Sequence, residues 1–160
     1  MSFHSVQLGT LDKYVWVVAL LIAIGFFAIG KPWQYFIGDP TANIIFKGDG
    51  AMQRGDFTEA AAIFAEAAAK QPRNPEFRAR LGLAYGALKR WPDALAQYQY
   101  ALSLDGNNLT AHRGMGLYAL ELRQLPQAEE WRKRLASLCP QGCPDLTALT
   151  AEISKARLRR

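Results

Sequence analysis

The sequence contains few of the residues on which enzyme chemistry and metal binding depend. Among its 160 residues are two histidines, His4 and His112, and two cysteines. It has no HExxH motif, no glycine-rich phosphate loop and no cysteine spacing typical of a zinc site. His112 falls early in a predicted helix, where a histidine more often packs in the core than takes part in catalysis. We therefore expect no enzyme activity, no small-molecule substrate, no cofactor and no metal.

The sequence also lacks a strong charge of one sign. Lysine and arginine total 19 against 14 aspartate and glutamate, and the net charge of +5 comes from residues 47–160. A nucleic-acid-binding surface should combine clustered basic residues with stacking aromatics, so this mild surplus favours an ordinary solvated face and no nucleic-acid partner. The basic tail, Arg157, Arg159 and Arg160, is interpreted as a solvated helix end, with contact to anionic lipid or to an acidic partner as the alternative.

One long apolar run lies near the N-terminus. Residues 14–30 carry no charge and are flanked by Lys13 and Lys31. At about 1.5 Å per residue the run spans about 25 Å, and flanking lysines can reach across the rest of a hydrocarbon core of about 30 Å. We predict a single transmembrane helix in a lipid bilayer, with a cleaved signal peptide as the alternative. The expected membrane anchors are Tyr14, Trp16, Phe26, Phe27 and Trp33.

This run divides the chain into parts. Residues 1–13 form a short tail before the helix, and residues 31–40 form a connector after it. The connector, KPWQYFIGDP, is aromatic and contains proline, whereas a flexible linker would be rich in glycine and serine. We therefore expect the region that follows, residues 41–140, to be held close to the bilayer.

Residues 41–140 contain a repeat with a spacing of about 34 residues. In the middle copy Leu81, Gly82 and Tyr85 lie on one face of a predicted helix, and the next helix repeats small and aromatic residues at helical spacing. The register continues through three copies without an insertion. The positions that correspond across the copies are Gly48, Gly82 and Gly116; Phe57, Trp91 and Leu125; Ala60, Ala94 and Ala128; Phe64, Tyr98 and Arg132; and Ala67, Ala101 and Leu135.

The pattern resembles that of the tetratricopeptide repeat family. The residues that carry the resemblance in the middle copy are Leu81, Gly82, Tyr85, Ala94, Tyr98 and Ala101. The resemblance implies an all-α fold in which three helical hairpins stack into a solenoid, and it implies a protein-binding function. The chain departs from the family pattern at Arg78, where the family often has tryptophan, at Arg132, where it has an aromatic residue, and at Gly106, where it has proline.

Residues 141–160 follow the last repeat. Leu146, Leu149 and Ile153 lie on one face of a predicted helix over residues 145–158. A stack of repeats leaves its last apolar face uncovered, so we expect this segment to form a C-terminal capping helix.

In this family the first helices of successive repeats line a concave groove. The carboxylate clamp of some relatives is absent because Asp49 and Leu83 occupy asparagine positions, although Arg80 and Arg113 could still hold one carboxylate. The predicted groove is mainly apolar and suits an apolar strand or an amphipathic helix. The alternative is that these residues pack on neighbouring helices or on the connector. The predicted partner-binding residues are Ile45, Asp49, Met52, Glu76, Ala79, Arg80, Leu83, Arg113, Leu117 and Leu120.

Cys139 and Cys143 lie just after the third repeat, and the short loop between them can close a local disulfide. Two free thiols in a cytoplasmic domain are the alternative. Because disulfides persist in oxidising compartments, we predict a single-pass protein of the bacterial inner membrane, with a cytoplasmic N-terminus and periplasmic repeats.

These features together predict a membrane-anchored interaction protein. We expect an accessory or scaffolding subunit that grips protein subunits of a larger membrane complex of the bacterial envelope. The alternative is a periplasmic assembly chaperone that presents a client, for example an apocytochrome, to a maturation machine. Stoichiometry separates the two, because only a subunit remains with the mature complex in a fixed ratio.

Overall fold

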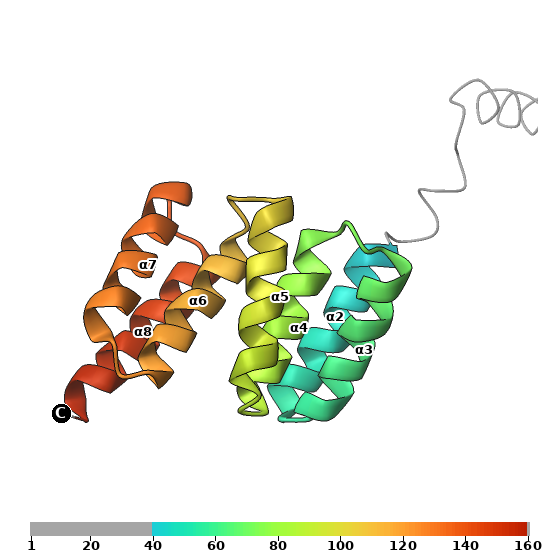
Figure 1. The fold of residues 1–160 in the computed structure, drawn as a ribbon, viewed down its shortest axis with the longest axis horizontal. Helices are drawn as coiled ribbons and strands as arrows, with labels where there is room; N and C mark the ends of the chain where they lie inside the picture. Colours follow the sequence, from blue (N-terminus) through green and yellow to red (C-terminus); the bar gives the residue numbers. More distant parts are fainter. Residues whose placement is uncertain (1–39, 160) are drawn as a thin grey trace, which may run out of the picture. The chain divides into compact units, whose positions relative to one another are not determined.

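The computed structural model describes residues 40–159 of the chain (Figure 1). The chain divides into two units, Met1–Ala42 and Asn43–Arg160. The predicted transmembrane helix over residues 14–30, its five aromatic anchors and most of the connector lie outside the described residues. Within residues 40–159 no helix has both the length and the apolar character needed to cross a membrane.

The described residues are all-helical, and they contain seven helices and no strand. Three consecutive pairs, α2–α3, α4–α5 and α6–α7, form antiparallel hairpins, and α8 follows the last pair (Figure 1). The predicted solenoid of helical hairpins is confirmed. The helices are α2 (Pro40–Arg54), α3 (Phe57–Lys70), α4 (Pro75–Ala87), α5 (Trp91–Leu104), α6 (Leu109–Glu121), α7 (Leu125–Leu138) and α8 (Pro144–Leu158).

The start of each later hairpin is specified by an asparagine. The side chain of Asn74 accepts a hydrogen bond from the backbone N–H of Glu76 at 3.0 Å, and Pro75 occupies the first turn of α4. Asn108 accepts from the N–H of Ala111 at 2.8 Å and caps α6 in the same way. An asparagine cap satisfies a free N–H at the helix start, so these residues fix where each hairpin begins.

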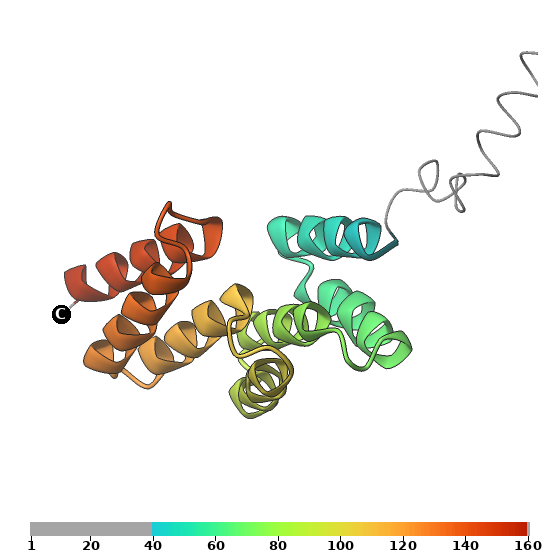
Figure 2. The ribbon, with the colours of Figure 1, turned by 90° about the horizontal axis from the view of Figure 1, so that it is seen from above.

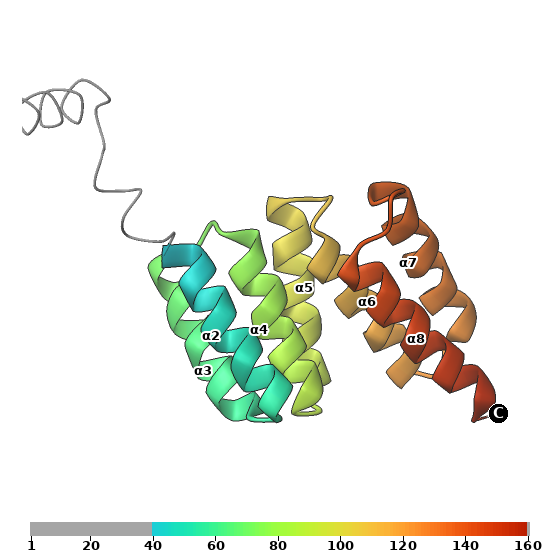
Figure 3. The ribbon, with the colours of Figure 1, turned by 180° about the vertical axis from the view of Figure 1, so that it is seen from behind.

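The end of the first helix of each hairpin is specified by a left-handed residue. Gly55, Lys89 and Arg123 have φ values of 84°, 62° and 57°. After each of them, the next residue donates its N–H to a carbonyl five residues earlier, at 2.8–2.9 Å, which is the bond of a helix-ending Schellman motif. The three turns follow the repeat, so the C-terminal ends of α2, α4 and α6 lie along one edge of the stack (Figure 3).

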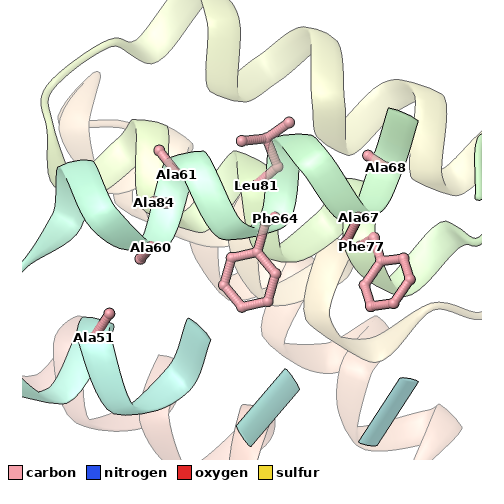
Figure 4. Packing of buried hydrophobic residues seen from close by; sticks show 9 residues of the cluster. All are labelled: Ala51, Ala60, Ala61, Phe64, Ala67, Ala68, Phe77, Leu81 and Ala84. Atoms are coloured by element: carbon pink, nitrogen blue, oxygen red, sulfur yellow. The ribbon is translucent and has the colours of Figure 1, made fainter. Parts of the chain in front are cut away.

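Aromatic side chains fill the space between the paired helices. Phe64 of α3 is buried in a cluster with alanines of α2, α3 and α4 and with Phe77 and Leu81 of α4 (Figure 4). Its ring lies against Gly48 so closely that a Cβ atom at Gly48 would overlap it. A glycine in a helix interior is normally destabilising, and here it leaves the room that the ring needs.

Tyr98 takes the corresponding place in the second hairpin and also reaches the third. A Cβ atom at Gly82 of α4 would lie 2.5 Å from Cε1 of Tyr98, and one at Gly114 of α6 would overlap the same ring. Tyr98 is completely buried. Its ring is therefore held between two glycine positions on successive helices and joins the second hairpin to the third.

The third hairpin has Arg132 where the first two have Phe64 and Tyr98. The space that an aromatic ring occupies in the first two hairpins is filled here by a side chain of α8. A Cβ atom at Gly116 would lie 2.6 Å from Cδ2 of Leu149, which comes from α8. Leu149 and Ile153 are buried against α6 and α7, so the predicted apolar face of residues 145–158 is confirmed. The α8 helix thus completes the core of the last hairpin.

Replacing Gly82 with alanine should lower the free energy of unfolding by about 1–3 kcal/mol, because the new methyl group overlaps the Tyr98 ring. Gly50 is the matched control, because the atom nearest to an added Cβ there is Nη1 of Arg54 at 3.4 Å, the end of a flexible side chain. Gly50→Ala should raise stability by about 0.5–1 kcal/mol. Urea unfolding followed by circular dichroism measures both, and equal effects of the two substitutions would contradict this packing.

Candidate functional site

The concave side of the stack contains a groove of about 900 Å³. Figure 2 shows the arrangement, in which α4 and α6 lie at the bottom of an arc while α2 and α8 rise on its two sides. All four helices contribute to the lining. The aliphatic residues that line the groove are Met52 of α2, Leu83 and Ala87 of α4, Leu117 and Leu120 of α6, Leu125 of α7, and Ala148, Ala151 and Ala156 of α8.

Half of the ten predicted partner-binding residues line this groove. These five residues are Met52, Leu83, Arg113, Leu117 and Leu120. The structure brings them together from three helices, as the repeat register requires. Their contact with a partner stays a prediction.

Ala79 does not belong to the groove surface, and its prediction as a partner-binding residue is wrong. Its side chain is fully buried against Ala101 and Ala111, so a partner cannot reach it. Ala79 lies on the face of α4 that packs on α5 and α6. Ile45 is only partly buried, and it packs against the core between α2, α3 and α4.

Asp49, Glu76 and Arg80 form a polar network within the chain. Nη1 of Arg80 donates to both carboxylate oxygens of Asp49, and Nε of Arg80 donates to Glu76 at 2.7 Å. Glu76 also accepts hydrogen bonds from Thr110 and Asn108, each at 3.0 Å. The network ties α2, α4 and α6 together, so here the packing interpretation of these residues holds.

The two arginines that could hold a partner's carboxylate already face carboxylates of this chain. Arg80 binds Asp49 and Glu76, and Nε of Arg113 lies 3.1 Å from Oδ1 of Asp145 at the start of α8. The Arg113–Asp145 contact is an ion pair without the alignment of a hydrogen bond, because Nε of Arg113 has no hydrogen-bond partner within residues 40–159. It helps to hold α8 on α6.

Two groove residues come from α5 and were not predicted. Trp91 and Tyr98 both line the groove, and both lie over Gly86, where an added Cβ would be 3.0 Å from the indole and 3.4 Å from the phenol oxygen. Trp91 Nε1 and the Tyr98 hydroxyl are buried and have no hydrogen-bond partner in the described part of the chain. Burial raises the pKa of the Tyr98 phenol, so the hydroxyl stays protonated. Because both atoms are buried, they are not exposed to a partner in the groove.

His112 packs in the core, as the sequence predicted. The residue is 8% exposed, its Nε2 lies 2.9 Å from the carbonyl oxygen of Gly106, and its ring centroid is 5.5 Å from that of Trp131. Nothing in these contacts resembles a catalytic arrangement.

Cys139 and Cys143 lie in the short connection between α7 and α8. Their Cα atoms are 6.0 Å apart, and their sulfur atoms lie at a disulfide distance. This Cα separation is within the range that a disulfide requires. The oxidation state of the pair stays a prediction.

Comparison with known proteins agrees with the geometry. A family model described as Tetratricopeptide repeat matches residues 47–108 and 80–142. Protein O-mannosyl-transferase Tmtc2 of Drosophila melanogaster is 33% identical over 85 residues, which are 50% of this chain and 9% of that protein. The chain thus matches less than a tenth of the length of this relative.

Several solved structures share the fold. The first TPR domain of human RPAP3 is 23% identical with a TM-score of 0.59, and the match covers 72% of this chain and 91% of that chain. The Yersinia enterocolitica type III secretion chaperone SycD, in complex with a peptide of the translocator YopD, is 18% identical with a TM-score of 0.57 and coverages of 75% and 92%. The TPR2B domain of yeast Sti1, in a complex with pHsp70, is 16% identical with a TM-score of 0.60 and coverages of 74% and 97%.

Replacing Tyr98 with phenylalanine should leave the free energy of unfolding unchanged or raise it by up to about 1 kcal/mol. The substitution keeps the ring between α4 and α6 and removes a buried hydroxyl that has no partner. Thermal unfolding of both proteins, followed by circular dichroism, measures the difference. A loss above about 1 kcal/mol would show that the hydroxyl makes a hydrogen bond in the folded protein.

Proposed function

Because this chain belongs to the tetratricopeptide repeat family, whose domains mediate protein–protein interaction, we propose that it binds a segment of a partner protein in the groove between α2, α4, α6 and α8. In this proposal the chain is an accessory or scaffolding subunit of a membrane complex. The observation that carries it is the groove itself, a concave surface with both apolar and charged lining residues that no helix of residues 40–159 fills.

The likeness to peptide-binding proteins supports this proposal. SycD was solved with a peptide of YopD, and the first TPR of Spaghetti was solved with an HSP90 peptide. These partners are those of the other proteins and do not identify the partner of this chain. They do show that other domains of this fold bind a peptide of a second protein.

A membrane anchor would strengthen such binding. We propose that residues 14–30 hold the chain in the bacterial inner membrane and that the repeats lie in the periplasm with Cys139 and Cys143 oxidised. Two proteins confined to one membrane meet at a high effective concentration, so a groove of modest affinity is enough to keep a partner bound.

The second candidate function is that of an assembly chaperone. It is favoured by the fold shared with SycD, which is itself a chaperone. Purification in mild detergent separates the two functions, because a subunit accompanies the mature complex in a fixed ratio and a chaperone is absent from it.

Filling the groove should abolish partner binding without unfolding the protein. Ala151 lines the groove from an exposed position on α8, so Ala151→Trp adds bulk there without entering the core. Ala96→Trp is the matched control, because Ala96 is exposed on α5 and does not line the groove. The protein that co-purifies with the wild type in fixed ratio should be lost from the first variant and kept by the second. Retention by both variants would exclude the groove as the binding surface.

The proposed topology makes a separate prediction about the cysteines. On intact cells with a permeable outer membrane, Cys139 and Cys143 should resist a membrane-impermeant thiol reagent until a reductant is added. The physical reason is that a disulfide has no free thiol to react, and the periplasm keeps it oxidised. Labelling that appears only after lysis, and needs no reductant, would place the repeats in the cytoplasm.

A further inference from the structure

The charged side chains of the groove are mostly basic. They comprise Lys89, Arg113, Arg123, Lys155 and Arg159 against two glutamates, Glu121 and Glu152. Each glutamate is already paired with a lysine of the same lining, Glu121 with Lys89 at 3.6 Å and Glu152 with Lys155 at 2.7 Å. The groove therefore offers no carboxylate that is free to receive a basic partner.

Two of the arginines have no ion pair within residues 40–159. Arg123 follows the end of α6 and Arg159 follows the end of α8, and both are exposed. Because α4, α6 and α8 run in the same direction, their C-terminal ends lie at one edge of the stack (Figure 3). We call this edge, with Lys89, Arg123 and Arg159, the basic end of the groove.

Exposed leucines lie next to the arginines of the basic end. Leu122 is 48% exposed and Leu158 is 88% exposed, and each directly precedes one of the two arginines. The floor of the groove beside them is formed by Leu117 and Leu120. A segment that covers this surface must place apolar side chains beside negative charges.

We propose that the occupant of the groove is an acidic amphipathic helix of a partner protein, whose carboxylates pair with Arg123 and Arg159 while its apolar face lies on Leu117 and Leu120. This inference rests on the proposed function and adds the chemistry of the partner. It places the recognition of charge at the α6–α7 turn and at the end of α8. A bilayer surface would also suit leucines beside arginines, but it cannot enter a concavity of about 900 Å³.

The test uses the full chain in detergent micelles and two fluorescent designed helices. Both peptides carry leucine along one face, and one has glutamate where the other has lysine. Fluorescence anisotropy should show that the glutamate peptide binds about tenfold more tightly than the lysine peptide, and that this difference shrinks in high salt. The double variant Arg123→Glu and Arg159→Glu should lower the affinity for the glutamate peptide by about tenfold and raise the affinity for the lysine peptide.

Arg73→Glu is the matched control. Arg73 is exposed in the turn before α4, at the opposite end of the helices, and this substitution should change neither affinity. Melting temperatures of all variants identify any loss of folding. Equal affinities for the two peptides, failure of both to bind, or the same loss in the Arg73 variant would overturn the proposal. A double variant that loses binding to vesicles of anionic lipid and keeps peptide binding would also overturn it, in favour of a membrane contact.

Failure of this inference can be distinguished from failure of the proposed function. If Ala151→Trp removes the natural partner while the charge reversals leave that partner bound, the groove is the binding surface and only the acidic character of the occupant is wrong. If Ala151→Trp has no effect, the proposed function fails together with this inference.

Discussion

The close contact between glycine and an aromatic ring is the constraint on which the stack depends. Tyr98 lies between Gly82 and Gly114, on the first helices of two successive hairpins. Close packing in protein interiors leaves no room for an additional methyl group at either glycine. One ring therefore fixes the distance between α4 and α6, and these two helices form the floor of the groove. The spacing of the helices that form the binding surface is therefore set by the packing of one buried ring at the groove.

The role of α8 follows from the same constraint. The third hairpin has Arg132 at the position of the ring, so it cannot fill the space beside Gly116 with its own side chain. Leu149 of α8 fills that space instead. As a result α8 lies parallel to α6 and adds a fourth helix to the concave side, where its small residues Ala148 and Ala151 keep the groove open. The departure from the repeat pattern at Arg132 is thus linked to the presence of α8 along the groove.

Ion pairs also help to hold α8 in its position on α6 and α7. Arg113 pairs with Asp145 at its start, and Arg157 pairs with Glu129 of α7 nearer its end. The hydrogen bond from Arg132 lowers the pKa of Glu129, so this carboxylate is charged at neutral pH and holds both arginines. Each pair is partly exposed and weak by itself. Together with the buried leucine and isoleucine, they fix α8 in one register.

The repeat period made the fold predictable from the sequence, and it made the site predictable only in part. Spacing assigned Gly82, Tyr98 and the turn at Lys89 to their places, because each depends on local helical geometry that recurs with the repeat. It placed Met52, Leu83 and Leu117 on the concave side for the same reason. It could not show that Ala79 is buried, that Arg80 is saturated by Asp49, or that α8 lines the groove. These properties depend on the rotation between hairpins, which local spacing does not contain.

The central claim is that the concave surface, and not the outer face, meets the partner. Photo-crosslinking in cells tests it most directly, with a benzophenone amino acid placed at Ala148 of the groove or at the exposed Gln99 of α5. If the partner binds in the groove, one protein should be crosslinked from position 148 and none from position 99. The same partner captured from position 99, with nothing from position 148, would contradict it.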